Sequence, residues 1–235
     1  MTAKDPVRRI VAMGGGGFLM DGDDTRLDDF VLSLAGRARP RVCLLPTASG
    51  DSDRMVAQFH RAFQDRDVDA RHLTLFGRPR AALRDYLLAA DVIYVGGGNT
   101  ANMLAVWRAH RVDVHLREAW ERGVVLTGVS AGMLCWFECG VTDSFGRLAP
   151  LRDGLGLLPG SACPHYDGEA DRRPTYHHLL AQGFPAGYAA DDGAALVFRG
   201  TELEACVASR PGAGCYRVAA DGGSVAEEAL LTRPL

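Results

Sequence analysis

A serine between two glycines is the feature of the sequence with the clearest chemical meaning. Residues 128–132 read Gly-Val-Ser-Ala-Gly, after a short apolar run (124–126) typical of a buried strand and before a proline-free segment (131–137) that suits a helix. This is the nucleophile-elbow arrangement, in which a tight turn presents a serine at the end of a sheet. The two glycines are needed because Cβ atoms there would collide with the neighbouring strand and helix. The alternative is a glycine- and serine-rich turn without chemistry, and the flanking strand and helix favour Ser130 as a nucleophile.

A serine that attacks a carbonyl group also needs amide donors for the oxyanion that forms. The amide of Ala131 lies at the predicted helix N-terminus, where N–H groups lack partners. A second glycine loop, Gly-Gly-Gly-Asn-Thr at 96–100, follows a strand-like run at 92–95. Sites in open α/β sheets lie at the carboxyl ends of strands, so Gly98 is well placed to give the second donor. The other use of such a loop is phosphate binding, but the Lys-Ser/Thr that a P-loop requires is absent.

His165 is the candidate general base. The preceding Pro164 cannot donate to a strand ladder and favours extended geometry before it, which places the histidine at a strand end. An isolated histidine is more often a surface residue, but the serine elbow upstream favours the catalytic role. A carboxylate must then orient the imidazole and stabilise its protonated form. Two aspartates are candidates, Asp192 in an Asp-Asp-Gly turn and Asp143 in the segment after the elbow.

A run of four glycines at 14–17 follows a first strand expected at residues 9–13. It raises the alternative of a dinucleotide-binding loop. That fingerprint requires glycine at its sixth position, where this chain has Leu19, and an acidic residue at the end of the second strand, which here reads Leu-Leu-Pro-Thr (44–47). We therefore predict a turn that brings the backbone close to the site, and no cofactor.

The order of the elements predicts the fold. Strands are expected at 9–13, 41–45, 71–76, 92–95 and 124–126, and helices at 25–37, 52–64, 81–89, 112–121 and 174–182. Alternation of strands and helices indicates an α/β fold with a doubly wound, mostly parallel sheet and helices on both faces. The tail, residues 203–235, predicts a small C-terminal β extension. The length fits a single domain over residues 1–235.

Composition excludes several classes of function. The 235 residues are 47% hydrophobic and 23% charged, with a net charge of −3, so no basic face for nucleic acid is expected. No apolar segment approaches the length of a membrane span and no signal peptide precedes the first strand, which makes the cytoplasm the expected compartment.

The six cysteines form no C-x-x-C pair, so neither a metal site nor a disulfide framework is indicated. The expected partner is a small peptide substrate, and a homodimer is compatible with the sequence.

Four motifs in this order resemble peptidase E, the α-aspartyl dipeptidase family of serine peptidases, which is related to cyanophycinase. They are the segments 96–100, 128–132, 163–166 and 191–193. The resemblance covers nearly the whole chain, from the first strand to about Phe198. It implies a fold similar to that of class I glutamine amidotransferases, with a serine where those enzymes carry cysteine, and a peptidase E-like domain over residues 1–235.

The resemblance also implies roles for the site residues. Ser130 matches the nucleophile, His165 the base, and Gly98 with Ala131 the oxyanion hole. Asp192 matches a position that is glutamate in the best-known members, and an aspartate is one methylene shorter. Asp143 lies near an aspartate that is also implicated in activity in that family. We therefore rank Asp192 first as the acid that orients the histidine and keep Asp143.

Dipeptides with an N-terminal aspartate are the substrates that the resemblance implies. In that family an arginine shortly after the histidine holds the β-carboxylate; Arg172 matches best, and a guanidinium fork suits a carboxylate. The segment from His165 to Arg172 is shorter than in the enterobacterial enzymes. Asn99 is expected to contact the substrate as well. The alternative at Arg172 is a solvated charged loop without a role in binding. The alternatives for the function of the whole protein are cyanophycinase-like hydrolysis of β-aspartyl peptides and a non-catalytic amidotransferase-like binding domain.

Overall fold

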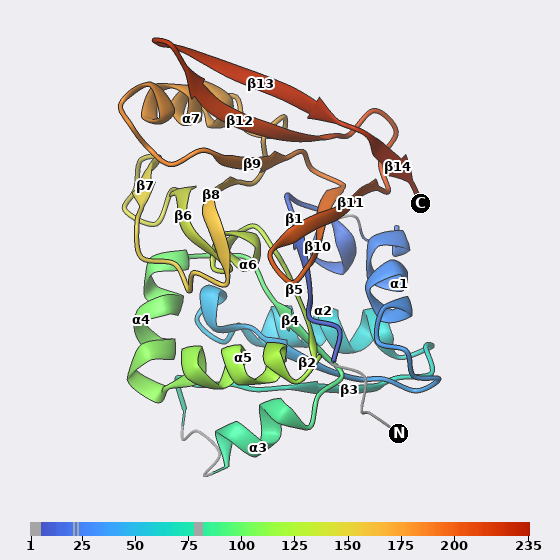
Figure 1. The fold of residues 1–235 in the computed structure, drawn as a ribbon. Helices are drawn as coiled ribbons and strands as arrows, with labels where there is room; N and C mark the ends of the chain where they lie inside the picture. The colour runs from blue at the N-terminus through green and yellow to red at the C-terminus, as the bar shows by residue number, and fades with distance from the viewer. Residues whose placement is uncertain (1–5, 21, 23, 78–81) are drawn as a thin grey trace.

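Two β-sheets form the framework of the molecule (Figure 1). The structure is a computed structural model of the chain, and it describes residues 6–20, 22, 24–77 and 82–235. The larger sheet has the strand order β14-β11-β10-β1-β5-β4-β2-β3, and the smaller sheet has the order β13-β12-β9-β8-β6-β7. The α/β fold predicted from the sequence is therefore confirmed, with a second sheet that was not predicted.

The larger sheet is parallel through its N-terminal strands, as predicted. These are β1 (Arg9–Met13), β2 (Arg41–Leu45), β3 (Asp69–His72), β4 (Val92–Val95) and β5 (Val125–Val129). Three later strands extend it: β10 (Ala194–Arg199), β11 (Glu202–Ala208) and β14 (Thr232–Pro234). β10 is antiparallel to both β1 and β11, so part of the predicted C-terminal extension belongs to the main sheet.

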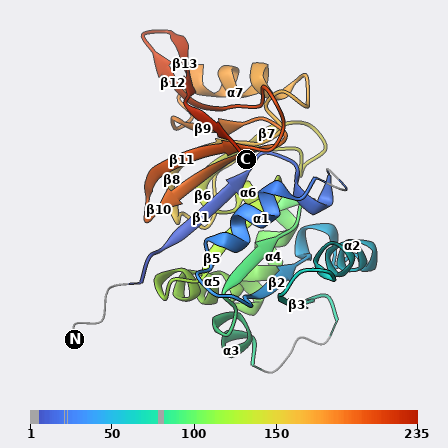
Figure 2. The same cartoon turned by 90° about the vertical axis from the view of Figure 1, so that its right-hand side faces the viewer.

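Helices cover both faces of this sheet (Figure 2). They are α1 (Arg26–Ser33), α2 (Asp53–Phe63), α3 (Leu83–Leu88), α4 (Thr100–His110), α5 (Val112–Glu121) and α6 (Ala131–Leu134), with short 3-10 turns at Gly17–Leu19 and Thr47–Ser49. The remaining helix, α7 (Arg172–Ala181), packs on the smaller sheet. Alternate residues of each strand enter different cores. In β1, Ile10 packs with the α3, α4 and α5 side and Val11 packs with the α1 and α2 side. Burial on both faces explains why these strands are continuous apolar runs.

The predicted helix from 131 to 137 is shorter in the structure, because α6 ends at Leu134 and β6 (Phe137–Thr142) begins three residues later. The apolar residues of this segment fit a buried helix as well as a buried strand, so periodicity could not separate the two. Strand pairing makes this segment a strand, because β6 lies between β7 (Ala149–Leu151) and β8 (Leu158–Cys163) in the smaller sheet.

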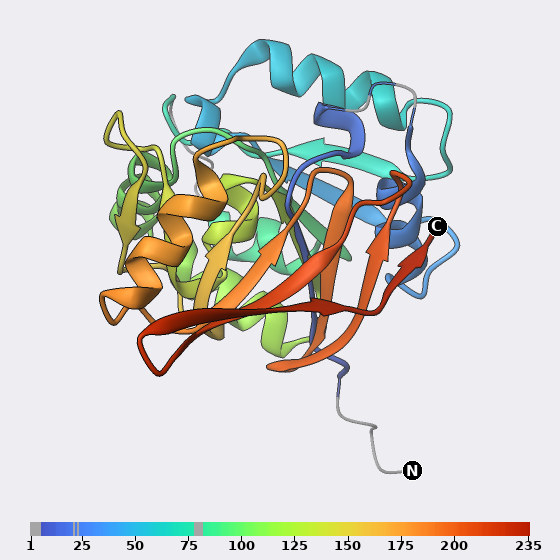
Figure 3. The same cartoon turned by 90° about the horizontal axis from the view of Figure 1, so that it is seen from above.

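The smaller sheet continues through β9 (Gly187–Ala190) into the hairpin of β12 (Cys215–Asp221) and β13 (Ser224–Leu230). A turn at residues 221–224 joins the two strands of the hairpin. Helix α7 packs on this sheet and buries Tyr176 and Leu180 in a third core. Figure 3 shows the hairpin crossing the molecule before the chain ends beside α1, where the Arg26 guanidinium donates to the carbonyl oxygen of Leu235.

The loops that carry the predicted site residues meet at one edge of the main sheet. β1, β4 and β5 are adjacent and parallel, so the loops that follow them share this edge. β10 runs antiparallel to β1, which brings the turn before it, residues 191–193, to the same place. Within the described residues, no helix has the length and apolar character needed to cross a bilayer.

Candidate active site

Ser130 occupies a strained position in the tight turn between β5 and α6. Its backbone angles, φ 58° and ψ −109°, are uncommon for any residue other than glycine. A Cβ atom on Gly128 would lie 2.7 Å from the Cα atom of Gly132, and a Cβ atom on Gly132 would lie 2.4 Å from the carbonyl oxygen of Val95. Both distances are too short for a real contact. The turn therefore has the geometry of the nucleophile elbow that the sequence predicts.

His165 follows β8 and forms a hydrogen bond with Asp192. The distance between His165 Nδ1 and Asp192 Oδ1 is 2.6 Å, and the two side chains are 11% and 27% exposed. Because an ionised carboxylate only accepts, Nδ1 carries a proton, which leaves Nε2 as the ring nitrogen that can act as a base. Of the two candidate acids, Asp192 is the one in contact with the histidine, whereas Asp143 lines a pocket beside the site.

The hydrogen bond from His165 lowers the pKa of the Asp192 carboxyl, and the charges of His165 and Arg210 act in the same direction. A carboxyl group with a lowered native pKa stabilises the fold above its unfolded pKa of about 4. This stabilisation is lost as the pH falls through the native pKa. Asp192 is therefore ionised at neutral pH, as the orienting acid of a catalytic histidine must be.

The glycine run after β1 forms the predicted turn, and it brings the backbone close to the Asp192 side chain. A Cβ atom on Gly15 would lie 1.9 Å from Asp192 Oδ1, and one on Gly168 would lie 2.0 Å from Oδ2. The Gly193 amide donates to the carbonyl oxygen of Gly15 over 3.1 Å. Absence of side chains at Gly15 and Gly168 is thus what leaves room for the carboxylate that holds His165.

Two further residues, Asp167 and Arg210, fix the backbone of Asp192, and sequence analysis missed both. The Asp192 amide donates to Asp167 Oδ1 over 2.9 Å, and Arg210 Nε donates to the Asp192 carbonyl oxygen over 2.9 Å. Arg210 also forms an ion pair with Asp167. Asp167 could have been noticed from its place two residues after His165. Nothing local marks Arg210, because its role depends on the β11–β12 connection.

The second glycine loop, which contains the predicted oxyanion donor Gly98, lies beside Ser130. A Cβ atom on Gly97 would lie only 3.4 Å from the Ser130 Cβ atom. The Ser130 amide itself donates to the carbonyl oxygen of Met13 over 3.2 Å. Across the described part of the chain, the amides of Gly98 and Ala131 have no hydrogen-bond acceptor, which leaves them available to an oxyanion.

Asn99 ties this glycine loop to the turn between β6 and β7. Its Oδ1 accepts from the Asn102 amide over 2.9 Å and caps α4, while its Nδ2 donates to the Ser144 carbonyl oxygen over 3.0 Å. The Ser144 hydroxyl in turn accepts from the Ala101 amide over 3.2 Å. The side chain is thus placed to hold two loops together, and its predicted contact with substrate stays a prediction.

Arg172, the predicted carboxylate-binding residue, is buried and paired within the chain. Its side chain is 2% exposed. Its Nε lies 2.7 Å from Glu169 Oε2, its Nη2 lies 3.3 Å from Glu169 Oε1, and its Nη1 donates to the Val141 carbonyl oxygen over 2.8 Å. A substrate carboxylate can therefore use this guanidinium fork only if Glu169 moves away from it.

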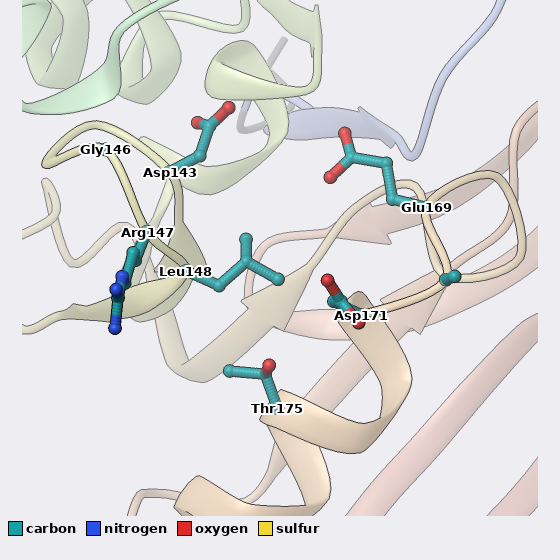
Figure 4. Close-up of a pocket in the computed structure, with 8 residues that line it drawn as sticks. Asp143, Gly146, Arg147, Leu148, Glu169, Asp171 and Thr175 are labelled. Carbon is teal, nitrogen blue, oxygen red and sulfur yellow. The ribbon is translucent and has the colours of Figure 1, made fainter.

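A pocket of about 740 Å³ opens beside these residues (Figure 4). One wall is the turn from β6 to β7, and the other is the segment that leads into α7. The lining residues are Asp143, Gly146, Arg147, Leu148, Glu169, Ala170, Asp171 and Thr175. The Glu169 amide donates to the His165 carbonyl oxygen over 3.1 Å, so one residue of the lining is held to the backbone of the histidine.

Residues 10–206 match the family model described as Peptidase family S51. The chain belongs to peptidase family S51. The uncharacterized peptidase YgaJ of Bacillus subtilis (strain 168) is 52% identical over 230 residues, which cover 97% of this chain and 100% of that protein. Peptidase E of Streptomyces coelicolor (strain ATCC BAA-471 / A3(2) / M145) is 30% identical over 131 residues, or 55% of this chain and 52% of that one. The resemblance to peptidase E drawn from four short motifs is therefore confirmed.

A solved structure shows the same fold. The crystal structure of a peptidase from an acI-B1 Actinobacterium superposes with a TM-score of 0.69 at 18% identity, over 96% of this chain and 95% of that one. At this identity the likeness concerns the fold. It extends over the smaller sheet as well as the larger one, so the two-sheet arrangement is shared with a peptidase of known structure.

A polar cluster behind His165 includes β13, which lies beyond the part of the chain matched by the S51 family model. Tyr166 is 2% exposed; its hydroxyl donates to the Glu227 carboxylate and lies 2.9 Å from His177 Nε2. His177 Nε2 is 3.0 Å from Glu227 Oε2. The sequence analysis did not identify Glu227. The cluster joins the residue next to the candidate base to the C-terminal hairpin.

The contact between Gly15 and Asp192 gives a direct test of the site. We expect Gly15→Ala to lower kcat by about 100-fold or more, because a methyl group there must displace the carboxylate that orients His165. Steady-state kinetics on any cleaved peptide measures the effect. Gly77→Ala is the matched control, since a Cβ atom at that glycine has nothing within 4 Å. Equal activity of the two variants would contradict the proposed role of the Gly15 turn.

Proposed function

We propose that this S51 family member is a serine-type peptidase that hydrolyses small peptides through the triad Ser130, His165 and Asp192. The observation that carries the proposal is the 2.6 Å hydrogen bond from His165 to Asp192, at the sheet edge where the strained elbow presents Ser130. A serine hydroxyl is a weak nucleophile at neutral pH and requires such a base. Membership of peptidase family S51 supports peptide bonds as the target.

The geometry supports acyl transfer. The Ser130 oxygen attacks the carbonyl carbon of the scissile bond while its proton passes to His165 Nε2. The amides of Gly98 and Ala131 stabilise the negative charge on the carbonyl oxygen. His165 then gives the proton to the departing amine, and a water molecule activated by the same imidazole hydrolyses the acyl-enzyme. Asp192 holds the Nδ1 proton and stabilises the imidazolium.

Dipeptides with an N-terminal aspartate are the substrates that the resemblance to peptidase E favours, with Arg172 as the group that binds the β-carboxylate. Under this proposal Glu169 leaves the guanidinium when substrate enters, and its exposed side chain is free to do so. Hydrolysis of β-aspartyl peptides, as in cyanophycinase, is the second candidate within the class. A non-catalytic binding domain is the third, and the histidine held by Asp192 together with the strained turn at Ser130 argues against it.

Removal of the nucleophile tests the reaction class. We expect Ser130→Ala to lower kcat by at least 10³-fold, on the order of what loss of a triad serine costs, with the circular dichroism spectrum unchanged. The assay uses Asp-Leu, Glu-Leu, Ala-Leu, N-acetyl-Asp-Leu and β-Asp-Arg, so it also separates the dipeptidase from the cyanophycinase-like activity. Near-normal turnover by the variant would show that Ser130 is not the nucleophile.

Two matched variants separate the candidate acids. Asp192→Asn is expected to lower kcat on the order of 10⁴-fold, because an amide in place of the carboxylate favours the wrong tautomer of His165. Asp143→Asn is expected to leave kcat close to that of the wild type, since Asp143 lines the pocket instead of contacting the histidine. The kcat of both variants is measured with the same assay. The reverse pattern, with only Asp143→Asn inactive, would overturn the assignment of Asp192.

A further inference from the structure

The β12–β13 hairpin lies beyond residue 206, where the match to the S51 family model ends. Both of its strands pack against α7, as Figure 1 shows. Neither strand supplies a residue of the proposed triad. Side chains of the hairpin nevertheless contact Tyr166 and Asp191, which are the sequence neighbours of the histidine and the aspartate of that triad.

Tyr166 directly follows His165 and is anchored by both its side chain and its backbone. It is 2% exposed, its hydroxyl donates to the Glu227 carboxylate of β13, and this hydroxyl lies 2.9 Å from His177 Nε2. Burial and the Glu227 carboxylate raise the pKa of the hydroxyl, so it stays protonated and remains a donor at neutral pH. The Tyr166 amide donates to the carbonyl oxygen of Ala190 over 3.1 Å. These contacts hold the strained backbone of His165, whose φ is 52°, in place.

Asp191 directly precedes Asp192 and is anchored by the hairpin as well. It is 2% exposed, and its Oδ2 accepts from the Gly214 amide over 2.9 Å and from the Tyr216 hydroxyl over 3.2 Å. The Asp191 amide donates in turn to the Gly214 carbonyl oxygen over 3.0 Å. The turn that presents Asp192 is therefore tied to the first residues of the hairpin.

Arg173 of α7 joins these two anchors. Its guanidinium carbon lies 4.5 Å from the centre of the Tyr166 ring and 5.1 Å from the centre of the Tyr216 ring, and a cation over an aromatic ring is attracted to it. Arg173 Nη1 is 3.4 Å from Glu227 Oε1. The other oxygen of Glu227 accepts from Tyr166 and is 3.0 Å from His177 Nε2. One carboxylate thus holds the groups that fix both turns.

We propose that Glu227 is a positioning residue for the histidine–aspartate pair and acts through Tyr166 and Arg173. The inference rests on the proposed function for the role of this pair, and it goes further by giving the C-terminal hairpin a part in the reaction. Loss of the carboxylate removes the acceptor that the Tyr166 hydroxyl and the Arg173 guanidinium share. The two turns then gain freedom, and the 2.6 Å hydrogen bond between His165 and Asp192 weakens.

The Nδ1 proton of His165 reports on this hydrogen bond without relying on turnover. A proton shared between an imidazole and a carboxylate gives a downfield proton NMR resonance, which Asp192→Asn should remove. We expect Glu227→Ala to shift or broaden this resonance and to lower kcat by about tenfold, because a small misplacement of a catalytic group is costly. KM should stay close to that of the wild type. Glu228→Ala is the matched control, since Glu228 is the next residue of β13, is exposed and points to the opposite face of the sheet.

Two further variants separate positioning from a general loss of stability. Glu227→Gln keeps an oxygen that accepts from Tyr166, so it should recover most of the kcat that Glu227→Ala loses. Tyr166→Phe removes only the hydroxyl. Because it breaks the same contact, its effect on kcat should be less than additive with that of Glu227→Ala in the double variant. Circular dichroism establishes that each variant is folded, and the Glu227→Gln and Tyr166→Phe proteins provide the test if Glu227→Ala is not.

A folded Glu227→Ala protein with the resonance and the kcat of the wild type would overturn the inference. Fully additive effects of Tyr166→Phe and Glu227→Ala, or an equal loss of kcat in Glu228→Ala, would overturn it as well. If the wild type hydrolyses no peptide while its His165 resonance still depends on Glu227, the proposed function fails and the positioning of the histidine by the hairpin stands.

Discussion

The space around the Asp192 carboxylate is the constraint on which the rest of the site depends. Both of its oxygens lie where a Cβ atom would stand on a neighbouring residue, Gly15 on one side and Gly168 on the other. The antiparallel pairing of β1 with β10 brings the first glycine loop and the Asp-Asp-Gly turn together. Only a backbone without side chains allows this approach, and the result is a 2.6 Å hydrogen bond that orients His165. Asp167 and Arg210 then hold the turn from outside.

Backbone strain at the proposed nucleophile and the proposed base is the second common feature. Ser130 and His165 both have positive φ, 58° and 52°, and each such position costs about 1–3 kcal/mol. The strain persists because the strands before them are buried. β5 lies between β1 and β4 in the middle of the main sheet, and β8 lies between β6 and β9 in the smaller one. One sheet therefore positions the proposed nucleophile, and the other positions the proposed base.

The sequence predicted the parts of the fold that are governed by local rules. The parallel strands, the elbow, the close-approach glycine turn and helix α5 over Val112–Glu121 follow from apolar runs, glycine positions and helical periodicity. It did not predict β6 or the smaller sheet, because the run from Trp136 onward is apolar enough for either element and only pairing decides. The roles of Arg210, Glu227 and the Glu169–Arg172 pair were also out of reach, since each depends on a contact made by the tertiary structure. The burial of Arg172 and its pairing with Glu169 are set by the fold and are not marked in the sequence around it.

Chemical labelling of the nucleophile tests the central claim most directly. A fluorophosphonate reacts with a serine hydroxyl only when a neighbouring base activates it, so mass spectrometry of the treated protein reports on the triad without a substrate. We expect one adduct per chain, located on the peptide that contains Ser130, and a loss of labelling in the His165→Ala protein. Absence of an adduct on Ser130 in the folded wild-type protein, or equal labelling of the His165→Ala protein, would contradict the account of Ser130 as a nucleophile activated by His165.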